Sequence, residues 1–236
     1  MTLPVQRTAF IRKYNPEHDL QAVIRVFRET CDESLKIEPI WTLGYYIWCR
    51  PYLLLSPESC FVVDDGKGEA VGYIIGAPNS GAFCERWQEE YVPYILPELE
   101  HLPPGPGRGD EASLDIAYRT NSLGISIRSN PRKLVLGDYP DDLQNLGHLH
   151  IDLLPSHQRQ GLGKHLISAF TSAVKAQGCT GLFLGMAAAN HGAAKFYESC
   201  AFKRLPKVLD DGKSGELGRT AKNEDGGGTI YYVIGL

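Results

Sequence analysis

The sequence has no run of lysine and arginine, and its charges nearly balance. Of its 236 residues, 24 are Lys or Arg and 28 are Asp or Glu, so the formal net charge is −4. A protein that binds the phosphate backbone of a nucleic acid needs a basic patch or stripe. We therefore do not expect nucleic acid as a partner.

The six cysteines lack Cys-x-x-Cys pairs and the spacing of a zinc site. The first ten residues, MTLPVQRTAF, lack the apolar core of a secretory signal peptide. Since a chain of this length can bury a core without disulfides, we expect reduced cysteines and a cytoplasmic or nuclear location.

A long hydrophobic run is also missing. The longest apolar stretch, residues 41–55, is interrupted by Arg50 and Pro51 and is shorter than the roughly 20 residues that a spanning helix needs. No membrane span is expected. Hydrophobic residues make up 43% and charged residues 22% of the chain, a composition typical of folded globular proteins.

Apolar periodicity predicts an α/β fold, a mixed twisted sheet of six or seven strands flanked by helices. The predicted strands cover residues 10–14, 60–63, 70–76, 149–153, 181–186, 202–205 and 229–234, with the last one closing the sheet. The predicted helices cover residues 17–31, 41–54, 83–95 and 193–199, and another runs from Leu162 to a cap at Gly178. The pattern over 114–127 fits either a helix or a strand.

The Pro-Pro-Gly-Pro-Gly segment at 103–107 is a loop by composition. It could link two domains. However, the strand at 149–153 needs the earlier hairpin to complete a sheet. The prediction is therefore one domain over 1–236, with an insertion around 79–145.

The clearest functional signal is a strand, a glycine-rich turn and a helix in succession. The turn is Gln158-Arg159-Gln160-Gly161-Leu162-Gly163. The first turn of a helix has free N–H groups and a positive dipole end, and glycines let the backbone approach an anion. The motif alone is weak, and a plain tight turn is the alternative. No Gly-Lys-Ser/Thr sequence follows, so a Walker-type phosphate loop is excluded.

Two motifs in order make the sequence resemble the GNAT acyltransferase superfamily. They are Ile151-x-Leu153-Leu154-Pro155-x-x-Gln158-x-x-Gly161-x-Gly163 and Asn190-x-x-Ala193-x-x-Phe196-Tyr197-Glu198, followed by Phe202. The resemblance covers residues 146–205 by motif and residues 8–76 by element order. One departure is Ala201 before Phe202, where the family usually has glycine.

The resemblance implies a GNAT-like sheet that splays at its fourth strand, with acetyl-CoA as acyl donor. In the family, that strand pairs with the pantetheine arm, the glycine-rich turn holds the pyrophosphate, and the later Asn and Tyr contact the reactive end. The implied cofactor-binding residues are Ile151, Leu153, Leu154, Gln158, Arg159, Gln160, Gly161, Leu162, Gly163, Lys164, Asn190, Ala193, Phe196 and Tyr197.

A narrower likeness is to the acetyltransferase-like domain related to O-GlcNAcase. It rests on residues 148–155 with Asp138-Tyr139-Pro140 upstream, and on residues 70–76 leading to 83–91. Some members of that group are thought to lack catalysis. The alternative to an enzyme is therefore a non-catalytic acetyl-CoA-binding or protein-interaction module.

Three residues are candidates for catalysis. Tyr197 matches the family's proton donor, and its alternative is a core tyrosine beside Phe196. Asp152, first, and His150, second, are candidates for the base that takes the proton of the amine. His148, on the same strand face, is expected to line a solvated groove. The His and Asp residues at alternate positions lack a fourth ligand, so a metal site is not expected.

The predicted function is transfer of an acetyl group to an amine by direct attack in a ternary complex, because no cysteine lies at a motif position. The acceptor, a small amine or a peptide lysine, and the oligomeric state stay open. Tyr45, Tyr46 and Trp48 could belong to the core or line the acceptor groove.

Overall fold

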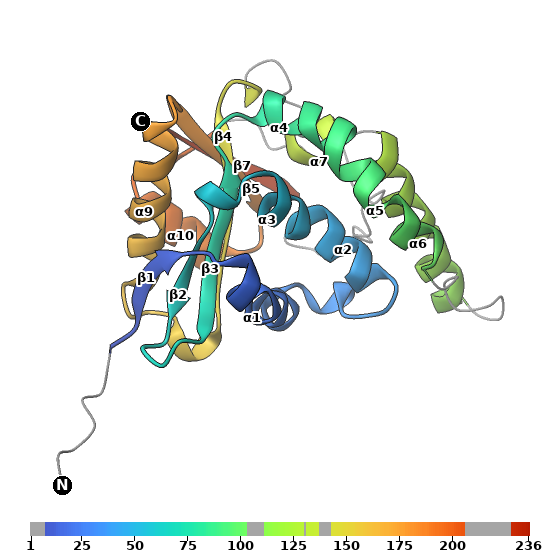
Figure 1. The fold of residues 1–236 in the computed structure, drawn as a ribbon, viewed down its shortest axis with the longest axis horizontal. Coiled ribbons are helices and arrows are strands. Elements are labelled where there is room, and N and C mark those ends of the chain that lie inside the picture. Colours follow the sequence, from blue (N-terminus) through green and yellow to red (C-terminus); the bar gives the residue numbers. More distant parts are fainter. Residues whose placement is uncertain (1–7, 103–110, 130, 137–142, 206–227) are drawn as a thin grey trace, which may run out of the picture.

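The computed structural model describes residues 8–102, 111–129, 131–136, 143–205 and 228–236. One open sheet runs through the molecule, with helices on both faces (Figure 1). This architecture confirms the predicted α/β fold class. The Pro/Gly segment at 103–107 lies outside the described residues.

Seven strands form the sheet. Their order in space is β1 (Phe10–Lys13), β2 (Phe61–Asp64), β3 (Ala70–Ala77), β4 (Gly147–Leu153), β5 (Gly181–Ala187), β7 (Thr229–Gly235) and β6 (Lys203–Arg204). The β4–β5 pair is parallel and all other pairs are antiparallel. The expectation that 229–234 closes the sheet is wrong, because β7 pairs with β5 on one side and the two-residue β6 on the other.

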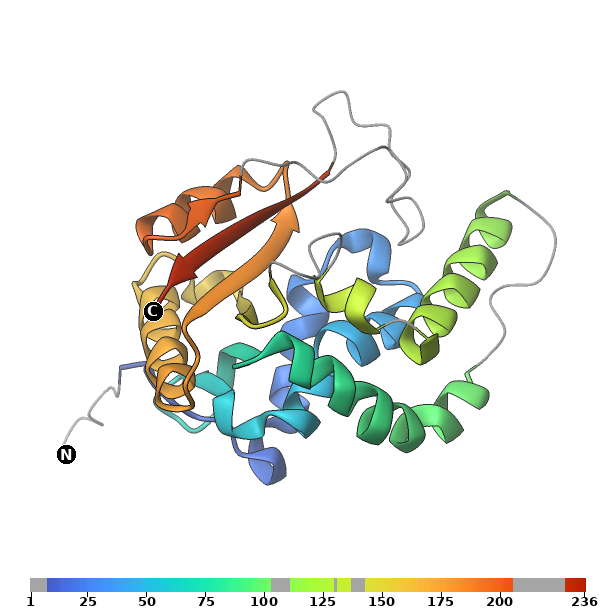
Figure 2. The same ribbon diagram turned by 90° about the horizontal axis from the view of Figure 1, so that it is seen from above.

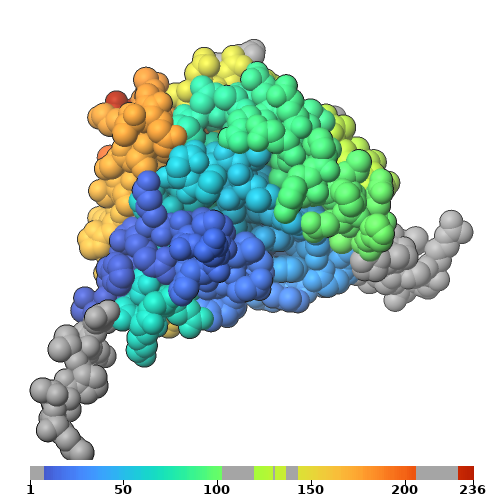
Figure 3. Space-filling model, in the orientation of Figure 1, coloured from blue at the N-terminus to red at the C-terminus, as the bar shows by residue number. Residues whose placement is uncertain are grey.

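Two groups of helices enclose the sheet. One group contains α1 (Pro16–Thr30), α2 (Ile40–Trp48), α3 (Arg50–Leu55), α4 (Ser80–Arg86), α5 (Val92–Glu100), α6 (Glu111–Ser129) and α7 (Pro131–Leu136); the other contains α9 (Leu162–Ala176) and α10 (His191–Ser199). Figures 1 and 2 show α9 and α10 together on one side of the sheet and α1–α7 on the other. In the space-filling view, residues of α1–α5 form most of the face turned toward the viewer (Figure 3).

The apolar core is divided accordingly into two main clusters. On the α1–α5 side, Tyr73 and Ile75 of β3 pack with buried residues of these helices. On the α9 side, Ile74 of β3 and Leu149 of β4 pack with α9 residues such as Phe170. This alternation along β3 is the period-two pattern of a strand buried on both faces.

The helices begin where local chemistry allows. The Asn15 side chain accepts a hydrogen bond from Glu17 N at 2.9 Å, and Pro16 occupies the first turn of α1, where a missing N–H costs little. The single helix expected over 41–54 is wrong. Cys49, with φ of −134°, separates α2 from α3, and Pro51 lies in the first turn of α3, the position where proline suits a helix start.

The ambiguous segment 114–127 is helical, as part of α6. The helix expected over 83–95 is α4 and α5 joined by a π turn at Trp87–Tyr91. β3 and β4 pair over six residue pairs although α4–α7 lie between them in the sequence. The β2–β3 hairpin and β4 therefore belong to one sheet. The single domain over 1–236 with an insertion around 79–145 stays a prediction.

Candidate active site

β4 and β5 separate shortly after they begin. Their pairing is limited to Gly147 with Leu182 and His148 with Phe183, although β4 continues to Leu153 and β5 to Ala187. The other edge of β4 stays paired with β3 throughout. The sheet thus opens at its fourth strand, and no residue of β4 beyond His148 has a partner residue on β5.

The register identifies which backbone groups point into this opening. Leu154 N donates to Val71 O at 3.0 Å, so residue 154 faces β3. Because successive residues of an antiparallel ladder face opposite edges, the N–H groups of Ile151 and Leu153 face the opening. The Leu153 carbonyl on that side accepts from Gln158 Nε2 at 2.9 Å. Two amides predicted to contact the cofactor are therefore free to pair with an amide-bearing chain.

The glycine-rich turn leads from β4 into the first turn of α9. Arg159 and Gly161 have positive φ values of 59° and 82°. The Gly161 carbonyl accepts from Lys164 and His165, which closes the first helical turn. Within the described chain, the N–H groups of residues 160–163 have no hydrogen-bond partner. Four free N–H groups at a helix N-terminus can bind an anion such as a pyrophosphate.

The start of α9 packs directly on α10. A Cβ at Gly163 would lie 3.0 Å from ring carbons of Phe196, so any larger residue there would have to displace this ring. Asn190 Oδ1 accepts from Ala193 N at 3.0 Å and caps α10. The two sequence motifs therefore meet in space, although the Asn190 carbonyl oxygen is already used by the helix. The exposed Lys164 lies beside the turn.

Asp152 projects from the other face of β4, toward α1 and α3. Its Oδ2 accepts a hydrogen bond from the Tyr73 hydroxyl at 2.5 Å, across the β3–β4 register. Burial raises the pKa of Asp152 to about 6, although the Tyr73 hydrogen bond acts in the opposite direction. Near neutral pH the carboxylate is ionised but takes up a proton more readily than an exposed aspartate.

Burial acts on the histidines with the opposite sign. It lowers the pKa of His150 to about 4 and the pKa of His148 well below its usual value. At neutral pH both rings are therefore uncharged. In an exposed groove a histidine has the pKa closest to neutral and is the better base. At this buried site the pKa of Asp152 is closer to neutral than that of His150, so Asp152 is the better base.

The expectation that His148 lines a solvated groove is wrong. His148 is 3% exposed and lies between the Tyr52 hydroxyl and Ser80 Oγ, at 3.1 and 2.7 Å. Tyr52, Tyr73 and Ser80 are site residues that the sequence did not indicate. They come from α3, β3 and α4, and only the strand register and helix docking bring them to β4.

Tyr197 is also buried, at 8% exposure. Its ring packs against Phe196, Phe202 and Tyr232, with centroids 5.2, 5.8 and 6.1 Å away. Burial raises the pKa of its hydroxyl, and the charge of Asp152 adds to the shift. Asp152 and Tyr197 thus act on one another across the site. A phenol with a raised pKa stays protonated and can donate a hydrogen bond.

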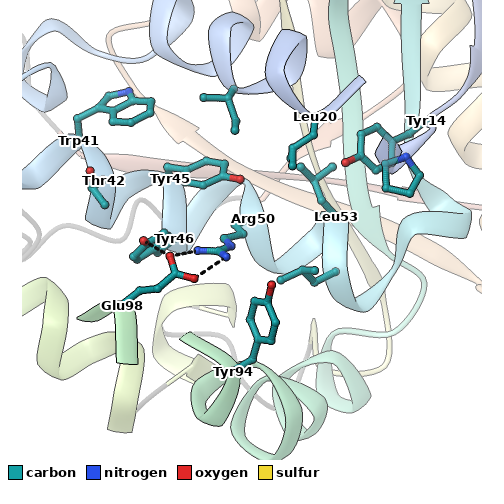
Figure 4. A pocket seen from close by; sticks show the side chains of 13 residues that line it. Tyr14, Leu20, Trp41, Thr42, Tyr45, Tyr46, Arg50, Leu53, Tyr94 and Glu98 are labelled. Carbon is teal, nitrogen blue, oxygen red and sulfur yellow. Dashed lines mark hydrogen bonds and ion pairs between the residues drawn. The ribbon is translucent and has the colours of Figure 1, made fainter. Parts of the chain in front are cut away.

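The aromatic residues of α2 have mixed roles. Tyr45 and Tyr46 are buried, at 8% and 7% exposure, and Trp48 is half-buried. Tyr45 and Tyr46 also line a pocket of about 460 Å³ between α1, α2, α3 and α5 (Figure 4). There Arg50 and Glu98 form a two-pronged ion pair, at 2.6 and 2.8 Å.

The comparisons with known proteins show which family this chain resembles. Residues 134–202 match the model of the acetyltransferase (GNAT) family. This match and the seven-stranded open sheet confirm the predicted resemblance to the GNAT superfamily. The narrower likeness to the O-GlcNAcase-related domain stays a prediction.

Solved structures share the fold over nearly the whole chain. The crystal structure of SsHAT is 25% identical, with a TM-score of 0.64 over 97% of this chain and 98% of that one. A phosphinothricin acetyltransferase of Sinorhizobium meliloti in complex with AcCoA is 13% identical, with a TM-score of 0.54 over 97% and 89%. The NatC complex bound to Gag peptide and CoA is 11% identical, with a TM-score of 0.52 over 97% and 99%.

Two further findings concern the described residues alone. None of their helices is both long and apolar enough to cross a membrane. They also contain no group of three or more His, Cys, Asp and Glu side chains arranged to hold a metal ion. The six cysteines, all within these ranges, are free thiols.

Proposed function

We propose that this protein is an acetyl-CoA-dependent N-acetyltransferase that acts on an amine by direct attack in a ternary complex. One observation carries the proposal: Asp152, a buried carboxylate with a pKa near 6, lies on the strand whose free amides face the β4–β5 opening. The same strand, β4, carries the proton acceptor and leads into the turn that would bind the anion.

The residues at the turn fit the acyl donor. The free N–H groups of residues 160–163 would bind its pyrophosphate, with Lys164 adding positive charge. The amides of Ile151 and Leu153 would pair with its pantetheine arm. One of them can also polarise the thioester carbonyl, as backbone amides do in oxyanion sites.

The proposed chemistry needs one proton acceptor and one proton donor. The amine nitrogen attacks the thioester carbon, the C–S bond breaks, and the acetyl group ends on nitrogen. Asp152 takes the proton that the nitrogen loses, and the Tyr197 hydroxyl donates a hydrogen bond to the departing sulfur. Because burial makes Tyr197 a weak acid, it stabilises the thiolate more by hydrogen bonding than by complete proton transfer.

Cys31 is the cysteine to exclude as an acyl carrier, because the charge of Asp152 acts on it. Burial is the main factor that raises the pKa of its thiol, so the reactive thiolate is disfavoured. Direct attack by the amine therefore needs no cysteine intermediate.

The test is a thiol-release assay with acetyl-CoA and a panel of small amines and lysine peptides. Both acceptor types belong in the panel, because the similar folds include a phosphinothricin acetyltransferase and a peptide-bound complex. We expect release that depends on the amine, intersecting double-reciprocal lines, and full activity in Cys31→Ser. Parallel lines, with activity lost in Cys31→Ser, would instead show an acyl-enzyme.

The burial of Tyr197 favours a second candidate, a module that binds acetyl-CoA without turnover. If its ring serves only packing, the site lacks a donor for the leaving thiolate. Binding of acetyl-CoA without acetyl transfer to any amine of the panel would establish this alternative.

A further inference from the structure

A chain of hydrogen bonds runs behind the site. It leads from α4 to β4, on to α3 and back to a second residue of β4. Tyr52 of α3 places its hydroxyl 3.1 Å from Nε2 of His148 and 3.1 Å from Nε2 of His150. On its far side, His148 Nδ1 lies 2.7 Å from Ser80 Oγ. The proposed chemistry assigns no role to Tyr52, His148 or Ser80.

Ser80 sets the direction of this chain. Its hydroxyl lies 2.6 Å from the Leu146 carbonyl oxygen, which can only accept. The single hydroxyl proton is therefore used there, so toward His148 Nδ1 the Ser80 oxygen can only accept. His148 must carry its proton on Nδ1. Since burial keeps this ring neutral, its Nε2 has no proton.

The same count of protons fixes the direction of the two hydrogen bonds at the Tyr52 hydroxyl. The bare Nε2 of His148 accepts the one hydroxyl proton of Tyr52, so the Tyr52 oxygen can only accept from His150. His150 therefore donates from Nε2. Its ring is also neutral, so Nδ1 is left with a lone pair. No hydrogen-bond partner for this Nδ1 occurs among the described residues.

We propose that Tyr52 is a positioning residue that holds His150 in the Nε2–H form, so that Nδ1 of His150 accepts a hydrogen bond from the incoming amine beside Asp152. This inference rests on the function proposed above and deepens it. His150 and Asp152 are two residues apart on one face of β4, roughly 7 Å along the strand. His150 is then an oriented acceptor rather than the base.

The arrangement also predicts the acceptor class. Asp152 and His150 each engage one N–H of the attacking nitrogen. A primary amine can satisfy both groups and still direct its lone pair at the thioester carbon. A secondary amine keeps fewer N–H groups and is expected to be used at least tenfold less efficiently, the effect of about one lost hydrogen bond.

The direct test is nitrogen-15 NMR of the histidine rings in the full chain at neutral pH. His148 should have a proton on Nδ1 and His150 a proton on Nε2. In Tyr52→Phe the ring still stacks on Phe83, whose centroid is 4.8 Å away, but His150 should populate both tautomers while His148 keeps Nδ1–H. Tyr91→Phe removes another buried hydroxyl, which donates to the Tyr46 carbonyl, and should change neither ring.

A kinetic measurement tests the consequence for the reaction. With a primary amine, Tyr52→Phe should lower kcat/KM about tenfold and leave acetyl-CoA affinity unchanged, and Tyr91→Phe should match the wild type. Wild-type His150 protonated on Nδ1, or an unchanged kcat/KM in Tyr52→Phe, would overturn the inference. If the wild type transfers no acetyl group at all, the proposed function fails. The NMR spectra of the histidine rings would still show in which direction the hydrogen bonds from Ser80 to His150 run.

Discussion

Replacing Gly161 by aspartate tests the anion-binding turn with little disturbance of packing. A Cβ at Gly161 would meet no atom within 4 Å, so neither aspartate nor asparagine clashes there. The φ value of 82° is a left-handed conformation, which both of these residues tolerate better than other non-glycine residues. Gly161→Asn is therefore a matched control: it shares the shape and the backbone strain of Gly161→Asp and lacks the negative charge.

The size of the effect follows from Coulomb's law. Two unit charges about 4 Å apart repel by about 1 kcal/mol in water and about 4 kcal/mol at the effective dielectric of a protein surface. Gly161 is exposed, so the lower half of this range applies, and several phosphate charges act together. We expect Gly161→Asp to bind acetyl-CoA roughly 10- to 100-fold more weakly than Gly161→Asn.

Isothermal calorimetry of both variants at low and high salt measures this difference. The difference should shrink at high salt, because exposed charges are screened over a Debye length of about 10 Å at 0.1 M. Thermal melts without ligand should coincide. Equal affinities in the two variants would refute the assignment of this turn to the pyrophosphate. Gly163 is less suitable for this test, because a side chain there would press on the Phe196 ring. A substitution at Gly163 would therefore change the packing as well as the charge.

The other predictions concern stability and catalysis. Acetyl-CoA at about 100 times its Kd should add about 2.7 kcal/mol of stability and raise the Tm by roughly 5–10 °C in a thermal melt, and a Tm unmoved at millimolar ligand would contradict the binding site. Tyr197→Phe keeps the ring in place and should lower kcat roughly a hundredfold with little change in acetyl-CoA affinity; near-normal turnover would make Tyr197 a core residue only. The pH profile of kcat/KM should fall as the pH drops through about 6, where the Asp152 carboxylate becomes protonated and can no longer accept a proton. Asp152→Asn should lose both most of the activity and this acidic limb, and an Asn variant that keeps the limb would assign it to another group.

The cofactor side of the site could be predicted from sequence because its parts are local. A strand, a glycine-rich turn and a helix follow one another within residues 147–176, and each is encoded by its own short pattern. The free N–H groups of residues 161–163 follow from any helix with its N-cap at Gly161. The Asn190 cap and the Phe196 contact with Gly163 belong to the second motif, and its helix was expected within two residues of its observed start.

The acceptor side could not be predicted in the same way, because it depends on distant pairings. Tyr73 reaches Asp152 only through the β3–β4 register, across 79 positions of sequence. Tyr52 reaches His148 and His150 only because Cys49 ends α2 and turns α3 toward the sheet. Burial then reverses the pKa order of carboxylate and imidazole, which no residue pattern on β4 reveals.

The most direct measurement is transfer of an isotopically labelled acetyl group from acetyl-CoA to a primary amine, followed by mass spectrometry of the amine. The wild-type protein should yield a labelled amide, and Asp152→Asn, which removes the proposed proton acceptor but keeps the side-chain shape, should yield far less at neutral pH. A wild-type protein that binds acetyl-CoA and labels no amine of the panel, or an Asp152→Asn variant as active as the wild type, would contradict the proposed function and its mechanism.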